Sequence, residues 1–508
     1  MKEKLKTREW RLNNLYWIKN DQGERIKFRL NWAQRLLFNG LWYLNIVLKV
    51  RQLGVTTFFC ILYLDDVLFN GYDAGLIAHT LQDATKIFDT KIKYPFDNLP
   101  EAIKAEYRVD TDNTRELKFK RGDIESSIYV GTSLRSGTVQ RLHISELGVM
   151  DQKYPKKAID IQSGALNTVH VGQLITIEST ARGQTGLFHD LCQEALKNKQ
   201  RKLKLTEMDY KFFFLPWWKH PQYELQGDIA IPSDMQDYFR QLEATEKIKL
   251  TQAKKNWYYK KSLMQGEQMK SEYPSTPDEA FEASIEGAYY GKQLTQVYEN
   301  KQITQVPYLP HLTVDTWWDL GTSKARKDST SIWFTQDVGL EIHVIDFYGN
   351  TGEGLAHYKK VLDDKGYIYG RHWAPHDIMV KEFTTGKTRY ESAKGLGLHF
   401  DVVPNIPFPD GIEAVRMILP KCWFDEERTA TGVKALASYR KEWDDTLGKF
   451  KDNPLKDWAS DPADAFRMMA VGHRDHMLLG YYDDEEQELE QIKNEQSAII
   501  DASNPFAM

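Results

Sequence analysis

The stretch KVRQLGVTTFF, residues 49–59, follows the pattern of a phosphate-binding loop but lacks the usual lysine. In the common pattern G-x-x-x-x-G-K-[S/T], glycines let the backbone wrap a phosphate, and the lysine reaches the β- and γ-phosphates. Gly54 and Thr56 are in register with this pattern, whereas Val55 occupies the lysine position and Lys49 the first glycine position. Alone, the stretch indicates either a nucleotide site or an ordinary turn between a strand and a helix.

An acid at the end of an apolar run could act together with this loop. In RLHISELG, Glu146 follows Ser145 at a place where an Asp-Glu pair is usual. The aspartate of such a pair helps to hold Mg²⁺, and the glutamate orients the attacking water. Because Ser145 is not a carboxylate, we expect metal binding to depend on Thr56 and on the phosphates. The ordinary alternative is a strand that ends in a surface acid.

Three more stretches carry side chains that suit a nucleotide. Arg135 lies in the small-residue loop GTSLRSGTVQ and could act as an arginine finger, which stabilises charge on the transferring phosphate. Ser179 and Thr180 follow a strand-like run and could sense the γ-phosphate. Gln34, in NWAQR, has an amide that suits adenine. Each has an ordinary interpretation, as a solvated turn, a glycine-rich loop or a helix-surface residue.

The elements around these residues are those of an α/β domain. A strand at 44–50, a loop at 51–57 and an apolar helix from 58 give the order that a phosphate loop needs, because a helix N-terminus supplies backbone N–H groups. Strands that alternate with helical material predict a mostly parallel sheet. The further strands are expected at 75–80, 126–133, 141–146 and 171–180, and a helix is expected to begin within 31–42.

Three aspartates in the second half of the chain occupy positions that suit metal ligands. Asp319 lies near the centre of the apolar run TWWDLGTS, where a lone carboxylate is costly unless it is paired or binds metal. Asp377 ends YIYGRHWAPHD, and Asp464 would start a helix in WASDPADAFRMMAVG. Carboxylates suit Mg²⁺ or Mn²⁺, and two such ions can cleave a phosphodiester. Alternatively, each is a strand-end acid, a turn residue or an N-cap.

The elements of this second half differ from those of the first. Three strand-like runs, at 313–321, 329–337 and 340–349, precede a helix at 352–366 and a strand at 367–377. Three strands, a helix and another strand form the opening order of an RNase H-like domain. The proline-containing stretch 301–313 marks the expected boundary. We therefore expect domains at 1–300 and 313–480, a linker at 301–312 and an acidic flexible tail at 481–508.

Bulk composition limits the classes of protein. A chain of 508 residues suggests two domains or more, and a net charge of −5 means that binding to DNA must depend on local basic patches. The three cysteines are far apart, which argues against disulfides and a zinc site. The charged N-terminus lacks the apolar region of a signal peptide, and no apolar run is long enough to span a membrane. We expect a cytosolic protein.

Together these stretches resemble the large terminase subunits of tailed bacteriophages, the ATP-driven motors that package double-stranded DNA. The resemblance implies an N-terminal P-loop (ASCE-type) ATPase domain with a mostly parallel sheet and a C-terminal RNase H-like nuclease domain with a mixed sheet. In the first half it rests on NWAQR, RQLGVTT, LRSGTVQRLHISELG, ITIESTARGQTGLFHD, FFFLPWWKHPQY and EYPSTPDEAF. In the second half it rests on DLGTSKARKDSTSIWF, VIDFYGNTGEGLAHY, APHDIMVKEFTTGKTR and DPADAFRMMA.

The resemblance also implies roles for residues. Lys49 or Arg51 would supply the charge that Val55 lacks, with Lys49 slightly favoured. Glu146 and Arg135 would be catalytic in the ATPase. Asp319, Asp377 and Asp464 would be the catalytic metal ligands of the nuclease, with Asp328, Asp461 or Asp346 as further candidates and His376 in support. The nucleotide would contact Gln34, Lys49, Arg51, Gln52, Leu53, Gly54, Val55, Thr56 and Thr57, of which Thr56 would also bind Mg²⁺.

The implied ligands and partners are those of a packaging motor. They are ATP with Mg²⁺, two Mg²⁺ or Mn²⁺ ions in the nuclease site, double-stranded DNA, the small terminase subunit and the portal protein of the procapsid. The chain would form a ring, a pentamer, during packaging and be a monomer in solution. It would act in the host cytoplasm, docked transiently at the portal and absent from the mature virion. DNA would contact Lys324, Arg326, Lys327, Lys381, Lys387, Arg389 and Arg416.

Two other functions fit parts of the sequence. A metal-dependent nuclease with a non-hydrolysing, ATPase-like scaffold would account for Val55 and Ser145. A helicase or chromatin-type translocase would share the ATPase residues but would leave the three aspartates of the second half unexplained.

Overall fold

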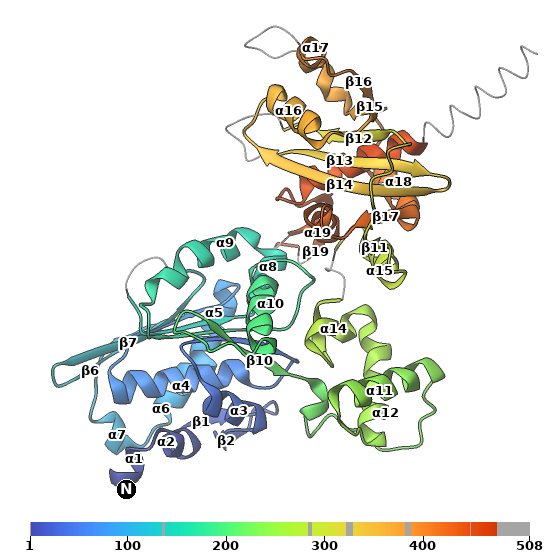
Figure 1. The fold of residues 1–508 in the computed structure, drawn as a ribbon. Coiled ribbons are helices and arrows are strands. Elements are labelled where there is room, and N and C mark those ends of the chain that lie inside the picture. Colours follow the sequence, from blue (N-terminus) through green and yellow to red (C-terminus); the bar gives the residue numbers. More distant parts are fainter. Residues whose placement is uncertain are drawn as a thin grey trace, which may run out of the picture. The chain divides into compact units, whose positions relative to one another are not determined.

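The structure, a computed structural model, describes residues 2–134, 138–282, 287–321, 329–380, 388–444, 446–447 and 449–474. They form two compact units, Met1–Glu286 and Gly287–Met508 (Figure 1). The division precedes the expected linker, because α15 (Gly291–Glu299) and β11 (Ile303–Thr304) pack and pair within the second unit. Within the described ranges, no helix combines the length and the apolar character needed to cross a membrane.

The first unit is built on an eight-stranded, mostly parallel sheet, which confirms the predicted α/β class. The ladder from β10 to β7 is parallel throughout, and β6 and β5 continue it as an antiparallel meander that was not predicted. The strand order is β10 (Tyr210–Leu215), β3 (Leu44–Lys49), β9 (Leu174–Ser179), β8 (Arg141–Ser145), β4 (Ala74–Ile77), β7 (Ile124–Gly131), β6 (Glu116–Arg121) and β5 (Arg108–Asp112).

One strand, β9, lies between the strand that precedes the loop and the strand that precedes Glu146. This inserted strand places a third parallel strand end between the loop and Glu146. Because β3, β9 and β8 are parallel, their carboxyl ends meet at one edge of the sheet, outside which ligands bind in open α/β folds. The order of the strands therefore brings residues 49, 145–146 and 178–179 to one place.

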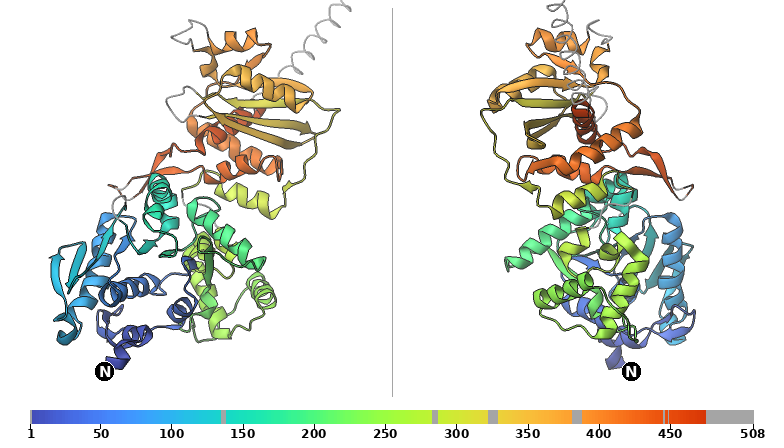
Figure 2. Two further views of the ribbon diagram at one scale, coloured as in Figure 1. Left: turned by 60° about the vertical axis from the view of Figure 1, so that its left-hand side comes forward. Right: turned by 90° about the vertical axis from the view of Figure 1, so that its right-hand side faces the viewer.

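Helices cover both faces of this sheet (Figure 2). Side chains of β3 alternate, so Val47 packs on one face while Ile46 and Leu48 pack on the other. The first face carries α2 (Arg8–Asn14), α3 (Trp32–Gly40), α4 (Val55–Asn70), α5 (Leu81–Phe88), α6 (Tyr94–Asp97) and α7 (Glu101–Lys104). The second face carries α8 (Leu147–Lys153), α9 (Pro155–Ser163), α10 (Leu187–Gln200) and α14 (Pro277–Glu282).

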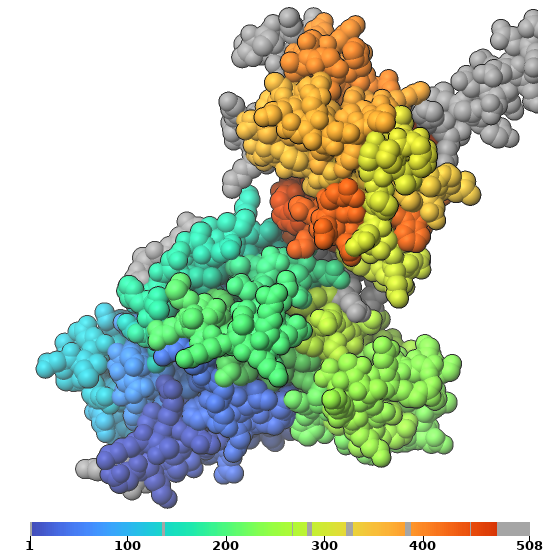
Figure 3. Space-filling model, in the orientation of Figure 1, coloured from blue at the N-terminus to red at the C-terminus, as the bar shows by residue number. Residues whose placement is uncertain are grey.

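Helix α4 is the central element of the first face. Its residues from Phe58 to Leu68 are all buried, since the sheet covers one side of the helix and α2 and α3 cover another. Three further helices join the same core and appear in Figure 3 as a bulge on the surface of the first unit (green). They are α11 (Ser233–Glu246), α12 (Gln252–Gln265) and α13 (Met269–Glu272).

The second unit contains a seven-stranded mixed sheet, as predicted. The antiparallel strands β12, β13 and β14 are followed by α16 (Leu355–Lys365) and then by β15, which is parallel to β12. This confirms the expected order of three strands, a helix and a strand. The order in the sheet is β11, β17 (Cys422–Asp425), β14 (Glu341–Thr351), β13 (Ser329–Val338), β12 (Val314–Asp319), β15 (Tyr369–Ala374) and β16 (Phe400–Val402).

Adjacent tryptophans of β12 pack on opposite faces of this sheet. Trp317 stacks on Trp373 with ring centroids 5.2 Å apart, and Trp318 packs in the core of the other face. The face of Trp317 is covered by α15, α18 (Phe408–Ile418), α19 (Ala430–Ser438) and a helix at 460–474. The face of Trp318 is covered by α16 and α17 (Arg389–Gly395). A hairpin of β18 (Lys441–Asp444) and β19 (Lys449–Pro454) completes the unit.

A buried ion pair attaches α2 to α4. The Arg11 side chain donates to both carboxylate oxygens of Asp65 at 2.7–3.1 Å, and Tyr16 Oη donates to the same carboxylate at 2.8 Å. Asp65 is completely buried. Removing one partner of a buried pair leaves an uncompensated charge in the core.

We therefore expect Arg11→Met to lower the free energy of unfolding by about 3–5 kcal/mol. The measurement is urea denaturation of the full chain, followed by circular dichroism. Lys6→Met is the matched control, because Lys6 makes an exposed pair with Glu3 that is worth about 1 kcal/mol or less. Equal destabilisation by the two substitutions would contradict this role of Arg11.

Candidate nucleotide and metal sites

The loop between β3 and α4 has the backbone of a tight, glycine-dependent turn. Gln52 and Gly54 both have positive φ, 61° and 69°, and Gly54 is the N-cap of α4. A Cβ added at Gly54 would lie 2.9 Å from Gln34 Nε2. The loop therefore requires glycine at this position, and the N-terminus of a sixteen-residue helix follows it directly.

Gln34 holds the loop in place from α3. Its Nε2 donates to the carbonyl oxygen of Gly54 at 2.9 Å, and its Oε1 accepts from the backbone N–H of Asn31 at 3.0 Å. Asn31 Nδ2 in turn donates to the carbonyl oxygen of Leu53 at 3.0 Å. Both ends of the Gln34 amide thus bind the chain itself, and its predicted contact with adenine stays a prediction.

Lys49 is buried at the end of β3, between two acids. Its Nζ lies 2.8 Å from Glu146 Oε1 and 3.1 Å from Glu178 Oε2. Burial disfavours the charged amine, but the negative charges of Glu146 and Glu178 outweigh it and raise the pKa of Lys49 above its ordinary value. Lys49 is therefore a fixed, desolvated cation at the edge where the three strands end.

Arg51, the other candidate cation, has a different environment. Its side chain is 58% exposed, and its Nε lies 2.5 Å from Glu272 Oε2. Glu272 also accepts from Arg182 Nη2 at 2.6 Å, and its carbonyl oxygen accepts from the backbone N–H of Arg51 at 3.2 Å. Arg51 thus joins the loop to α13 and to the segment after β9. Val55 packs in the core at the start of α4, so its side chain is not available to a ligand.

Glu146 has a backbone conformation that is uncommon for a residue with a side chain. Its φ is 58°, in the left-handed region, and it is the N-cap of α8. Its Oε2 accepts from Ser179 Oγ at 3.3 Å, and Ser179 Oγ accepts from the backbone N–H of Gly148 at 3.1 Å. The close approach of Gly148 to the carbonyl oxygen of Thr180 keeps α8 against the end of β9. These contacts fix the Glu146 carboxylate over the edge of the sheet.

Glu178 lies beside Lys49 and was not among the predicted site residues. Lys49, Thr56, Glu146 and Glu178 together form what we call the Lys49 cluster. It is completely buried on β9, and its Oε1 accepts from Thr56 Oγ1 at 2.7 Å and from Ser145 Oγ at 2.8 Å. Burial acts to raise the pKa of Glu178, but the charge of Lys49 and the neighbouring His143 ring lower it below its ordinary value. An acid inside the apolar run ITIEST was the available signal, the same kind that singled out Asp319.

Several predicted residues lie elsewhere or outside the described residues. Gln52 is exposed, whereas Leu53 is buried and Thr57 is half-buried. Arg135 and Asp328 lie outside the described residues, as do Lys324, Arg326, Lys327, Lys381 and Lys387.

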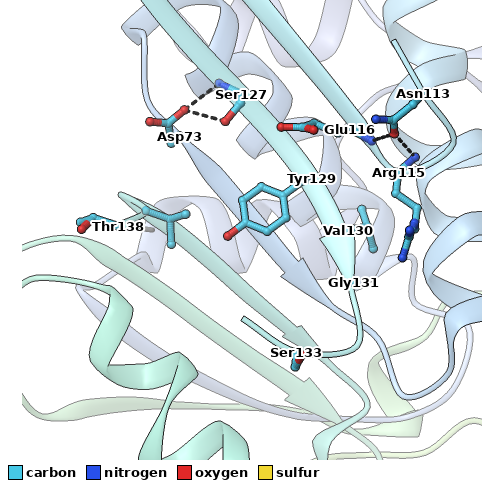
Figure 4. A pocket seen from close by; sticks show the side chains of 11 residues that line it. Asp73, Asn113, Arg115, Glu116, Ser127, Tyr129, Val130, Gly131, Ser133 and Thr138 are labelled. Atoms are coloured by element: carbon cyan, nitrogen blue, oxygen red, sulfur yellow. Dashed lines mark hydrogen bonds between the residues drawn. The ribbon is translucent and has the colours of Figure 1, made fainter. Parts of the chain in front are cut away.

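A separate pocket of about 570 Å³ lies beside β6 and β7 (Figure 4). Tyr129 and Ser133 are among its lining residues, and Asp73 accepts two hydrogen bonds from Ser127 at its wall. None of the residues of the Lys49 cluster lines it.

The three predicted aspartates of the second unit lie around one end of its sheet. Asp319 is the last residue of β12, not a residue at its centre, and Asp377 follows β15 in the turn His376–Met379. Asp464 lies inside the helix at 460–474 and not at its start, but Phe466, Met469 and Ala470 pack inward as expected. Burial, followed by the charges of Asp464, Asp461 and Asp377, raises the pKa of Asp319 well above its ordinary value.

These carboxylates differ in their partners. Asp377 Oδ1 is buried and accepts no hydrogen bond from the described residues, whereas Asp464 contacts Lys456 at 3.3 Å and Arg467 at 3.1 Å. Asp461 accepts from the backbone N–H and the hydroxyl of Ser329 at 2.6 and 2.9 Å. The Asp377 oxygen that accepts no hydrogen bond, and the Asp319 carboxylate whose pKa is raised, are oxygen ligands that suit a hard cation.

The aspartates do not form a ready-made cluster. In the described part of the chain, no group of three or more His, Cys, Asp or Glu side chains is arranged to hold a metal ion. The proposed ligand set therefore stays a prediction. Asp346 binds Lys365 and Tyr367 and is not among the charges that act on Asp319, which fits a structural role. His376 is exposed.

Comparisons with known proteins find similar chains only among solved structures. No protein-family model and no curated protein matches the chain. The large terminase of a thermophilic bacteriophage, in complex with ATP-γ-S, is 13% identical, with a TM-score of 0.29, over 84% of this chain and 93% of that one.

Two single-domain structures match the two halves of the chain. The ATPase domain of the Thermus phage P74-26 large terminase is 13% identical over 49% of this chain and 94% of that one, with a TM-score of 0.32. The nuclease domain of the bacteriophage SPP1 large terminase, with bound Mn, is 16% identical over 32% and 86%, with a TM-score of 0.25. At these scores the likeness by itself assigns no site. Phage large terminases, in their ATPase and nuclease parts, are what this chain is similar to.

Proposed function

We propose that this chain is the large subunit of a viral DNA-packaging motor, which hydrolyses ATP to translocate double-stranded DNA and cuts that DNA with its second domain. The observation that carries the proposal is the cluster of Lys49, Thr56, Glu146 and Glu178 at the carboxyl edge of three parallel strands. A buried lysine beside two carboxylates and a loop hydroxyl, at the N-terminus of a long helix, matches the needs of phosphoryl transfer.

Each member of the cluster has a distinct role in this proposal. The backbone N–H groups of the loop and Lys49 bind the phosphates, and Thr56 provides a hydroxyl for the magnesium ion. A magnesium ion held there would supply positive charge to offset the charge that develops on the phosphates during transfer. Glu146 orients the attacking water. Because Glu146 is paired with Lys49 at 2.8 Å, binding of phosphate by Lys49 releases the Glu146 carboxylate for this task.

Lys49, and not Arg51, takes the place of the missing lysine in this proposal. Lys49 Nζ already lies inside the acidic cluster, whereas the Arg51 side chain is directed to Glu272 and is largely exposed. Arg51 serves instead to connect the loop, through Glu272, to Arg182 in the segment after β9. The contact of Ser179 with Glu146 is a second connection between the nucleotide site and the segment after β9. Loss of the γ-phosphate is sensed through these two connections.

The second unit acts as the nuclease, with Asp319, Asp377 and Asp464 as ligands of two Mg²⁺ or Mn²⁺ ions. The support is the electrostatic coupling of these acids and the orphaned oxygen of Asp377. Arg389 Nη1 donates to the carbonyl oxygen of Leu320, next to Asp319, so a cation lies beside the acids where a DNA backbone would pass. The ions activate water and stabilise the leaving oxygen.

Partners and location follow from this function. The chain binds double-stranded DNA, the small terminase subunit and the portal protein, and it forms a pentameric ring during packaging. Arg135 acts on the nucleotide of the neighbouring subunit. The motor works in the host cytoplasm and leaves before the virion is complete. A non-hydrolysing scaffold remains the competing function for the first unit, since Val55 and Ser145 depart from the usual pattern.

Lys49→Ala and Glu146→Gln should each reduce DNA-stimulated phosphate release by about 100-fold or more, because each removes a charge that acts directly on the reacting groups. Arg51→Ala should cause a much smaller loss, since Arg51 lies outside the cluster. The measurement is phosphate release by the purified full chain with plasmid DNA, after thermal melts have shown that each variant is folded.

Two results would contradict this assignment. Full activity of Glu146→Gln would exclude its role with the water, and abolition of activity by Arg51→Ala but not by Lys49→Ala would exchange the two cations. No phosphate release by the wild-type protein at any DNA concentration would favour the scaffold.

Asp377→Ala and Asp464→Ala should each abolish Mg²⁺- or Mn²⁺-dependent cleavage of plasmid DNA, and EDTA should abolish cleavage by the wild-type protein. Their phosphate release should be unchanged, because the ATPase site lies in the other unit. Asp401→Ala is the matched control, since Asp401 is an exposed aspartate of the same sheet. Unchanged cleavage by both Asp377→Ala and Asp464→Ala would rule out these ligands.

A further inference from the structure

Ser145 leaves the proposed ATPase site without the carboxylate that usually holds magnesium. A serine hydroxyl is a neutral ligand, whereas a hard divalent cation bound to phosphates favours carboxylate oxygens. The position is at the end of β8, directly before Glu146, and the Ser145 side chain is buried there. Either the site binds magnesium weakly, or another residue supplies the charge.

Glu178 is placed to supply it. Ser145 and Glu178 are partners in the register of the parallel strands β8 and β9, so their side chains leave neighbouring positions of the same edge. Glu178 Oε1 lies 2.8 Å from Ser145 Oγ and 2.7 Å from Thr56 Oγ1, the loop hydroxyl that is expected to bind the ion. The additional methylene of glutamate lets a side chain on the adjacent strand reach the same hydroxyl.

The second oxygen of Glu178 provides an independent observation. Oε2 is buried and accepts no hydrogen bond of good geometry from the described residues, although Lys49 Nζ is 3.1 Å away. The Lys49 ammonium offsets the charge of this buried oxygen, which still has acceptor capacity for a second cation. The Glu178 carboxylate is thus directed both to the loop hydroxyl and to the cation that binds the phosphates.

We propose, building on the ATPase function above, that Glu178 supplies the magnesium-binding carboxylate of the nucleotide site from β9, in place of residue 145 on β8. The two departures in this site are then connected. Compared with the usual pattern, the lysine lies at the end of β3 and not at the start of the helix. The carboxylate lies on β9, the strand that pairs with β3. Lys49 and Glu178 remain within 3.1 Å of each other, so the buried charges still compensate.

The test compares nucleotide binding with and without magnesium in the full chain. The probe is a fluorescent ATP analogue, titrated in Mg²⁺ and in EDTA, so the readout does not depend on hydrolysis. Glu178→Gln keeps the size of the side chain and an acceptor for the Thr56 and Ser145 hydroxyls but removes the charge. In this variant, the factor by which Mg²⁺ increases the affinity for the nucleotide should fall by about 10- to 100-fold, while the affinity in EDTA should change little.

A second substitution distinguishes a magnesium ligand from a mere counter-ion of Lys49. Adding Ser145→Asp to Glu178→Gln returns a carboxylate to the usual strand and should restore the enhancement by Mg²⁺. Glu194→Gln, an exposed glutamate of α10, is the matched control and should behave as the wild type.

Three outcomes would overturn the proposal. Glu178→Gln could retain the full enhancement by Mg²⁺, it could lose binding equally in Mg²⁺ and in EDTA, or Ser145→Asp could fail to restore the enhancement. The last two would make Glu178 only the counter-ion of Lys49. If the wild-type protein bound no nucleotide under either condition, the ATPase function itself would fail, and this inference would fail with it.

Discussion

The placement of Lys49 between Glu146 and Glu178 is the interaction on which the nucleotide-site architecture depends. These three charges are buried or half-buried at the edge of the sheet. Glu146 lies 2.8 Å and Glu178 3.1 Å from the lysine amine. Such a cluster is stable only when the charges compensate one another, and the hydroxyls of Thr56 and Ser145 add hydrogen bonds to Glu178 Oε1. The strand order β3, β9, β8 is what makes this possible, because it places one strand with an acid directly beside the strand that ends in the lysine. The core on both faces of the sheet then holds the three strand ends in register.

This arrangement explains how a loop with two departures from the usual pattern can still be a phosphate site. Val55 is used for packing, so the cation comes from the strand and not from the helix. The left-handed backbone of Glu146 and the tight contact at Gly148 keep the Glu146 carboxylate at the same edge. Arg51, the slightly less favoured candidate from the sequence, is paired with Glu272, which also binds Arg182. It therefore connects the loop to the segments that surround it and does not supply the charge inside the cluster.

In the second unit, several acids are gathered at one end of the sheet. Its acids lie at the ends of β12 and β15 and inside the helix at 460–474, where Asp319 experiences the charges of Asp377, Asp461 and Asp464. Like charges that are brought together without a cation repel, and here Lys456 and Arg467 offset part of that repulsion at Asp464. An internal lysine offsets the acids of the first unit, and each unit has a buried carboxylate oxygen that accepts no hydrogen bond from the described residues, Glu178 Oε2 in the first and Asp377 Oδ1 in the second.

The sequence by itself determined the local elements and the candidate residues. The strand, loop and helix around residues 44–70, and the three strands, helix and strand of the second unit, follow from short-range patterns of apolar residues, glycine and proline. The pairing of β11 with β17 places residues 303–304, part of the expected linker, in the second unit, and a pairing over 100 positions leaves no local signal. Only the tertiary structure places Lys49 Nζ beside Glu146 and Glu178 and pairs Arg51 with Glu272. Lys49 meets Glu146 across 97 positions and Thr56 meets Glu178 across 122, and such contacts are set by the order in which strands pair, a non-local property that no stretch of residues encodes alone.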